Sequence, residues 1–100
     1  MVLPINESVR ILYRRSSAYP YEYAVMLQVM NGDGWETVIV CDNSHEGERW
    51  DDSVDDHHYH RYSGGKKRSP ESLPFEASTT NEAMAKAIEW FADDWEELIS

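Results

Sequence analysis

The feature that most constrains the fold is a pair of apolar runs joined by a glycine-rich turn. Tyr21–Met30 is rich in aromatic and β-branched residues, residues 31–34 read Asn-Gly-Asp-Gly, and Trp35–Asp42 is largely apolar again. Glycine adopts the positive φ angles of tight hairpin turns, and β-branched and aromatic residues favour strands. The sequence therefore predicts an antiparallel hairpin over residues 21–42.

The turn also predicts the register of this hairpin, because successive side chains of a strand point to opposite faces. With the loop centred on Gly32 and Asp33, one face carries the pairs Leu27–Val38, Val25–Val40 and Tyr23–Asp42. The other face carries Met30–Trp35, Met26–Ile39 and Ala24–Cys41. Both faces are largely apolar, so we expect a helix to cover one of them. The other face needs further structure or a second copy of the chain, which suggests a homodimer.

Three further elements complete the predicted fold. Val9–Arg15 and His57–Tyr62 read as strands, and Thr79 with Glu82 matches the capping box of a helix. An apolar stripe at helical spacing follows, made of Met84, Ala87, Ile88, Phe91, Trp95, Leu98 and Ile99. The intervening residues 1–8, 63–70 and 71–78 read as a lead-in, a flexible turn and an irregular segment. We predict a single α+β domain over residues 1–100, with an antiparallel sheet of about four strands and one C-terminal helix packed on one face.

Charge and composition narrow the classes of protein that fit. The formal net charge of −10 argues against non-specific nucleic-acid binding by the whole surface. The single cysteine, Cys41, lies in an apolar run, which favours a buried thiol in a reducing compartment. No apolar run approaches the roughly 20 residues of a membrane span. We therefore expect a soluble, cytoplasmic protein without a membrane partner.

Residues 42–62 concentrate the groups that carry chemistry. This stretch holds all four histidines and seven of the nineteen acidic residues, and it ends in HHYHRY at residues 57–62. In a strand, His58, His60 and Tyr62 share one face, with Arg61 on the other. Two imidazoles on one face lie close enough to act together. We therefore expect the functional site where the strand ending at Asp42 meets residues 57–62.

Metal binding is one chemistry that fits this spacing. His58 and His60, with Asp42 or His45, would supply three or four nitrogen and oxygen ligands. Such ligands suit Zn²⁺, Mn²⁺ or Ni²⁺. A His-x-His pair is common at these sites without being specific to them, so a divalent metal is an alternative to a site that needs no cofactor.

Metal-independent cleavage of RNA is a second chemistry. Histidine titrates near neutral pH, so His58 and His60 can share the roles of general acid and general base. Asp42 would orient one imidazole, and Tyr62 or Tyr59 would stack on a base or donate a hydrogen bond. The phosphate would be held by the basic residues nearby, which are Arg61, Lys66, Lys67 and Arg68. A third interpretation gives the histidines no chemistry, as members of ion-pair networks or of a solvated edge strand.

The order Asp-Asn, His, variable loop and His-x-His-Arg-Tyr resembles the small TumE-type toxin family and related bacterial and archaeal domains. The matching residues are Asp42, Asn43, His45, His58, His60, Arg61 and Tyr62, and the resemblance covers residues 20–100. It implies a toxin of a type II toxin–antitoxin pair that acts on RNA, with an antitoxin as its partner. The chain departs from such toxins in its long acidic loop after His45 and in its acidic rather than basic charge.

The negative charge also fits a different class of protein, an inhibitor that mimics nucleic acid, as some small phage-encoded proteins do. Carboxylates of residues 42–56 and of the helix would imitate phosphates and occupy the groove of a basic nucleic-acid-binding protein. The histidines have no role in this interpretation, so their substitution separates it from RNA cleavage.

Overall fold

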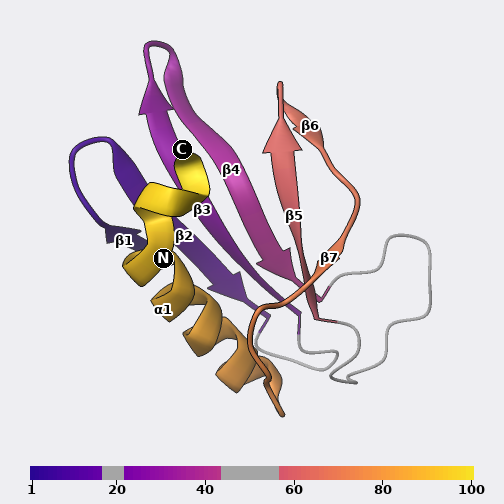
Figure 1. The fold of residues 1–100 in the computed structure, drawn as a ribbon. Helices are drawn as coiled ribbons and strands as arrows, with labels where there is room; N and C mark the ends of the chain where they lie inside the picture. Colours follow the sequence, from indigo (N-terminus) through magenta and orange to yellow (C-terminus); the bar gives the residue numbers. More distant parts are fainter. Residues whose placement is uncertain (17–21, 44–56) are drawn as a thin grey trace.

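The structure is a computed structural model that describes residues 1–16, 22–43 and 57–100, so the predicted acidic loop with His45 lies outside the described residues. Seven strands and one helix occupy the described ranges (Figure 1). In chain order they are β1 (Val2–Pro4), β2 (Val9–Arg15), β3 (Tyr23–Asn31), β4 (Gly34–Asp42), β5 (His58–Ser63), β6 (Lys66–Lys67), β7 (Glu71–Ser72) and α1 (Thr80–Ile99).

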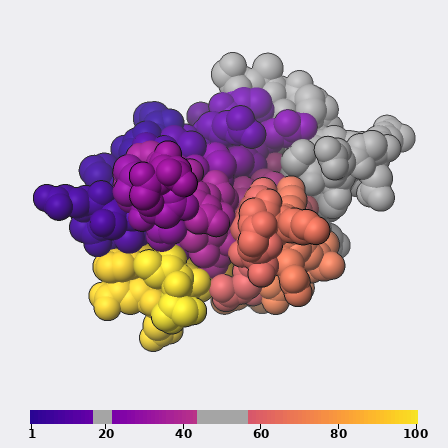
Figure 2. Space-filling view, turned by 90° about the horizontal axis from the view of Figure 1, so that it is seen from above, coloured from indigo at the N-terminus to yellow at the C-terminus, as the bar shows by residue number. Residues whose placement is uncertain are grey.

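The strands form an antiparallel sheet that α1 covers on one face (Figure 1). In the view from above, the C-terminal end of α1, in yellow, lies beside the strands (Figure 2). Their order is β1-β2-β3-β4-β5-β6, and β7 also pairs with β5. The α+β class, the antiparallel sheet and the C-terminal helix are therefore confirmed.

The predicted count of about four strands is wrong, because three short strands carry no sequence signal of their own. β1, β6 and β7 contain three, two and two residues, and all of these residues are exposed. They form where the chain folds back along the edge of a longer strand, β1 on β2 and the other two on β5. The predicted flexible turn is thus a small hairpin whose Gly64 and Gly65 both have positive φ.

The hydrophobic core lies between α1 and the sheet. Strands β2, β3 and β4 contribute alternate residues to it, among them the fully buried Ile11, Val25, Leu27, Ile39 and Cys41. From α1 come Ala83, Ala87 and Phe91, spaced four residues apart on one face of the helix. The alanines let the helix approach the sheet, and the Phe91 ring fills the remaining space.

The hairpin register differs from the predicted one by a β-bulge in β4. Near the turn, Met30 pairs with Trp35 as predicted, but Leu27 pairs with Ile39 and Gln28 with Thr37, so Val38 has no partner on β3. The predicted pairs beyond this point were wrong by one residue. Because a one-residue shift moves every later side chain to the other face, the bulge turns Asp42 away from α1.

The predicted start of the helix is confirmed. The Thr79 hydroxyl accepts a hydrogen bond from the backbone N–H of Glu82, at 3.1 Å, and α1 follows directly. A Thr cap of this kind satisfies one of the N–H groups that a helix leaves unpaired. In the described part of the chain, no helix combines the length and apolar character that crossing a bilayer requires.

Candidate functional site

A row of cross-strand neighbours runs over the face of the sheet opposite α1, here called the distal face. Arg14 on β2 pairs with Ala24 on β3, Ala24 with Asp42 on β4, and Asp42 with His58 on β5. Neighbouring strands lie about 4.8 Å apart, so these side chains adjoin one another. His60 projects from the same face, two residues after His58.

Asp42, His58 and His60 form one group, here called the Asp–His–His cluster. Each offers one nitrogen or oxygen atom, and these three atoms lie within 4.8 Å of one another. Nε2 of His58 lies 2.8 Å from Oδ1 of Asp42. The two imidazole rings meet edge to face, with their centroids 4.7 Å apart. The predicted proximity of two imidazoles and a carboxylate is therefore present in the structure.

The backbone of the β6 hairpin holds the His60 ring. Nδ1 of His60 lies 2.7 Å from the carbonyl oxygen of Arg68. A carbonyl oxygen can only accept, so we assign the proton to Nδ1, which donates it to this bond. The neutral ring then carries its lone pair on Nε2. Histidines that bind metals commonly have their other nitrogen fixed in this way.

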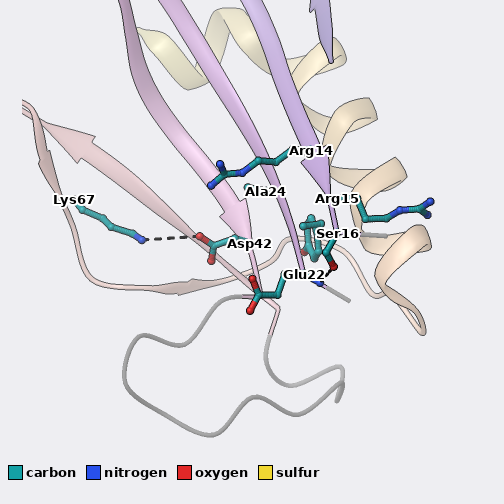
Figure 3. A pocket seen from close by; sticks show the side chains of 8 residues that line it. Arg14, Arg15, Ser16, Glu22, Ala24, Asp42 and Lys67 are labelled. Atoms are coloured by element: carbon teal, nitrogen blue, oxygen red, sulfur yellow. Dashed lines mark hydrogen bonds and ion pairs between the residues drawn. The ribbon is translucent and has the colours of Figure 1, made fainter. Parts of the chain in front are cut away.

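The two carboxylate oxygens of Asp42 have different surroundings. Oδ2 lies 3.9 Å from the ammonium nitrogen of Lys67 (Figure 3). Oδ1 is buried, and the ring nitrogen Nε2 of His58 lies 2.8 Å from it. The two oxygens of this carboxylate therefore face an imidazole on one side and an ammonium group on the other.

A pocket of about 560 Å³ adjoins the cluster at Asp42 (Figure 3). Its lining comprises Arg14, Arg15, Ser16, Glu22, Tyr23, Ala24, Asp42 and Lys67. Figure 3 shows Arg14 extending toward the side where Asp42 and Lys67 lie. Arg15 points the opposite way and donates a hydrogen bond to the Asn81 side chain of α1. The charged groups that line this side of the pocket are thus Arg14, Lys67 and the carboxylates of Asp42 and Glu22.

Arg61, the predicted phosphate ligand, lies on the other face of the sheet. Its guanidinium is 3.5 Å from the carbonyl oxygen of Leu98 in α1 and 3.9 Å from the Glu71 carboxylate. Strand alternation places His58 and His60 on the distal face, so the structure does not bring Arg61 to them.

The remaining predicted residues differ in how close they lie to the Asp–His–His cluster. Tyr62 follows His60 on the distal face and pairs with Lys67 across the β5–β6 ladder. Lys66 and Arg68 are exposed, and Arg68 meets the cluster through its backbone carbonyl. Lys67 is the predicted phosphate ligand that lines the pocket.

Sequence reasoning missed Arg14 and Ala24 as neighbours of Asp42. Their only signal is the pairing across three strands, which depends on the bulge in β4. It also missed the role of His57, which is buried with Nδ1 3.0 Å from the Tyr23 hydroxyl. Burial, with smaller effects of Cys41 and Asp42, raises the pKa of Tyr23 well above its ordinary value, so the hydroxyl stays protonated.

Comparison with known proteins gives a match to a protein family. A family model described as a domain of unknown function, DUF7718, matches residues 2–100. No curated protein and no solved structure matches the chain. The family match says nothing of TumE-type toxins, so that resemblance stays a prediction.

Proposed function

We propose that this chain, which belongs to the family described as a domain of unknown function, DUF7718, binds one divalent metal ion at the Asp–His–His cluster. The observation that carries the proposal is the meeting of three ligand atoms within 4.8 Å. Two ligands of a tetrahedral zinc ion, each about 2.0–2.1 Å from it, lie roughly 3.3 Å apart. Small side-chain rotations would therefore bring all three atoms onto one ion.

Two features of the ligands support this proposal. Oδ1 of Asp42 is buried and lies 2.8 Å from Nε2 of His58, so one ion between these two atoms would be held by both of them. The hydrogen bond from His60 to the Arg68 carbonyl would leave Nε2 of His60 available as a ligand. Imidazole and carboxylate together suit Zn²⁺, Mn²⁺ or Ni²⁺.

The metal site would keep a coordination position that no protein side chain fills. Structural zinc sites use four protein ligands, whereas catalytic sites use three and keep a position for water or substrate. The cluster supplies three described ligands and adjoins a pocket at Asp42. We therefore propose that the bound ion contacts a ligand in that pocket.

Titration of the metal-free protein with Zn²⁺ is expected to give one site per chain. His58→Ala, His60→Ala and Asp42→Asn each remove one ligand and should weaken binding by more than about 100-fold, because even the outer partners of a metal ligand contribute about 10- to 100-fold. Isothermal titration calorimetry measures stoichiometry and affinity, and the absorption spectrum of bound Co²⁺ reports the coordination number.

Asp33→Asn is the matched control, since Asp33 is an exposed carboxylate in the β3–β4 turn. It should bind Zn²⁺ as the unmodified chain does. Circular dichroism confirms that each variant is folded. Unchanged affinity in the folded His60→Ala protein, or no binding by the unmodified chain, would overturn the proposal.

Cleavage of RNA by the same imidazoles is a second candidate, which the surroundings of Asp42 favour. Lys67 lies beside this carboxylate, where it would stabilise the charge of a phosphate in the pocket. His58 and His60 would act as acid and base, with Asp42 orienting His58. Under this candidate the chain would be a toxin of the TumE type, with an antitoxin or a second copy of itself as partner.

This second candidate predicts cleavage of single-stranded RNA by protein freed of metal with EDTA. His58→Ala and His60→Ala should each slow cleavage by about 10²- to 10⁴-fold, the usual contribution of a general acid or base. Arg61→Ala should cleave normally, because Arg61 lies on the other face of the sheet. Gel analysis of the products measures the rates. Intact RNA with and without metal, together with normal growth of cells that express the protein, would exclude this candidate.

A further inference from the structure

A hollow lies on the distal face between Arg14 and Asp42. Arg14 and Asp42 lie on strands that are separated by β3, so their backbones are roughly 10 Å apart. The residue between them, Ala24, carries only a methyl group and is buried. A larger side chain here would fill the space between the guanidinium and the carboxylate. The hollow thus has an apolar floor, with charged groups on either side.

The charges around the hollow depend on whether a metal is bound. Arg14 and Lys67 contribute two positive charges, and Asp42 and Glu22 contribute two negative ones. Arg15 is directed toward Asn81 of α1 and away from this side of the pocket (Figure 3). A divalent ion on Asp42 would make the lining net positive. The hollow would then attract an anion.

From these features we propose that the hollow over Ala24 binds the phosphate group of a phosphate ester, between Arg14 and Lys67. This inference rests on the proposed metal site, since the ion would be the third positive group around the phosphate. A guanidinium donates two parallel hydrogen bonds to two phosphate oxygens, and an ammonium acts as a point charge on another.

The shape of the pocket favours phosphate over carboxylate. Arg14 reaches the hollow from β2, Lys67 from β6, and the metal ligands from β4 and β5. A tetrahedral phosphate directs oxygens toward all of these groups at once. A carboxylate has two oxygens in one plane and would leave one cation without a partner.

Metal and phosphate should therefore strengthen each other's binding. Two ligands that attract one another at neighbouring sites are coupled, and the coupling is the same in both directions. Without metal, the two carboxylates of the lining largely cancel the two cations. We expect phosphate to bind at least about 10-fold more tightly to the chain loaded with one equivalent of Zn²⁺ than to the metal-free chain.

The test uses the full chain, loaded with one equivalent of Zn²⁺ and freed of excess metal, with inorganic phosphate and dimethyl phosphate as probes. Binding is followed by calorimetry and by ³¹P NMR. Arg14→Met should weaken binding by about 10- to 100-fold, as expected for a hydrogen bond between charged groups. Ala24→Leu should block the hollow while Zn²⁺ still binds. Arg10→Met is the matched control, because Arg10 also lies on β2 but outside the pocket lining, over the Trp35 ring, and it should bind as the unmodified chain does.

The outcomes separate this inference from the proposed function. Binding of Zn²⁺ without binding of either probe overturns the phosphate site and leaves the metal site. Equal losses in Arg14→Met and Arg10→Met also overturn it, because they indicate a diffuse attraction of anions. If the chain binds no metal but binds phosphate in a way that needs Arg14, the metal site is overturned. The phosphate site in the hollow is then supported. Binding of dimethyl phosphate as tight as that of inorganic phosphate assigns the site to diesters, and preference for inorganic phosphate assigns it to monoesters.

Discussion

Phe91→Ala is expected to lower the free energy of unfolding by about 3–5 kcal/mol, the usual cost of removing a buried aromatic ring. Phe91 is 0% exposed and is the largest fully buried side chain among the described residues. It packs between α1 and the sheet, where the backbone cannot easily close the resulting cavity. The loss is a large part of the roughly 5–15 kcal/mol that stabilises a domain of this size. Urea denaturation followed by tryptophan fluorescence measures it.

Phe75→Ala is the matched control for this prediction. Both phenylalanine rings contact Trp90, with ring centroids 5.2 Å away for Phe91 and 6.2 Å away for Phe75. Phe75 is only partly buried, so its replacement should cost less than half as much. Equal losses in the two variants would mean that α1 contributes no more to the core than the segment before it.

The elements predicted correctly are those whose signals are local. The Asn-Gly-Asp-Gly turn between two apolar runs specifies the β3–β4 hairpin, whose pair Met30–Trp35 was predicted correctly. The Thr79 cap and the apolar stripe specify α1 in the same way. Each of these signals lies within a few residues of the structure that it determines.

The short strands could not be predicted, because their signal lies in other parts of the chain. β6 and β7 contain two exposed residues each and exist only because the edge of β5 is available for pairing. A periodic pattern cannot be recognised in two residues. The strand count was wrong for this reason.

The candidate site was predictable in part. The spacing of His58 and His60 places both on one face, and the structure places them there with Asp42. The role given to Arg61 conflicts with the same alternation, which puts this residue on the other face. Arg14 is separated from His58 by more than forty positions in the sequence. Only the pairing of four strands reveals that they belong to one row.

The bulge in β4 determines which face of the sheet carries Asp42, and it consists of one extra residue, Val38. Val38 lies between Thr37 and Ile39 but has no partner on β3. Without the bulge, Val38 would pair with Leu27, and every later residue of β4 would change faces. Asp42 would then face α1 as an unpaired carboxylate in the core, at a cost of several kcal/mol.

Deletion of Val38 is therefore expected to be tolerated. Thr37 and Ile39 would keep their partners Gln28 and Leu27 in a regular ladder, and Asp42 would stay on the distal face. The expected loss of stability is about 1–2 kcal/mol, for the partly buried Val38 side chain alone. Under the proposed metal site, Zn²⁺ affinity should change by less than about threefold. Urea denaturation and calorimetry measure the two quantities.

Deletion of Leu12 is the contrasting case. Leu12 is also a partly buried aliphatic residue, but the β2–β3 ladder pairs every residue from Val9 to Arg15 without a bulge. Deletion of Leu12 must move the side chains on one side of the deletion to the opposite face of the sheet. If the first half turns, Val9 and Ile11 leave the core, at about 1.5–3 kcal/mol each. If the second half turns, Arg14 leaves the distal face. We expect this variant to be largely unfolded or to lose phosphate binding, while the chain without Val38 keeps both. Similar damage in the two deletions would show that Val38 is a required part of the ladder, and that the bulge does not set the position of Asp42.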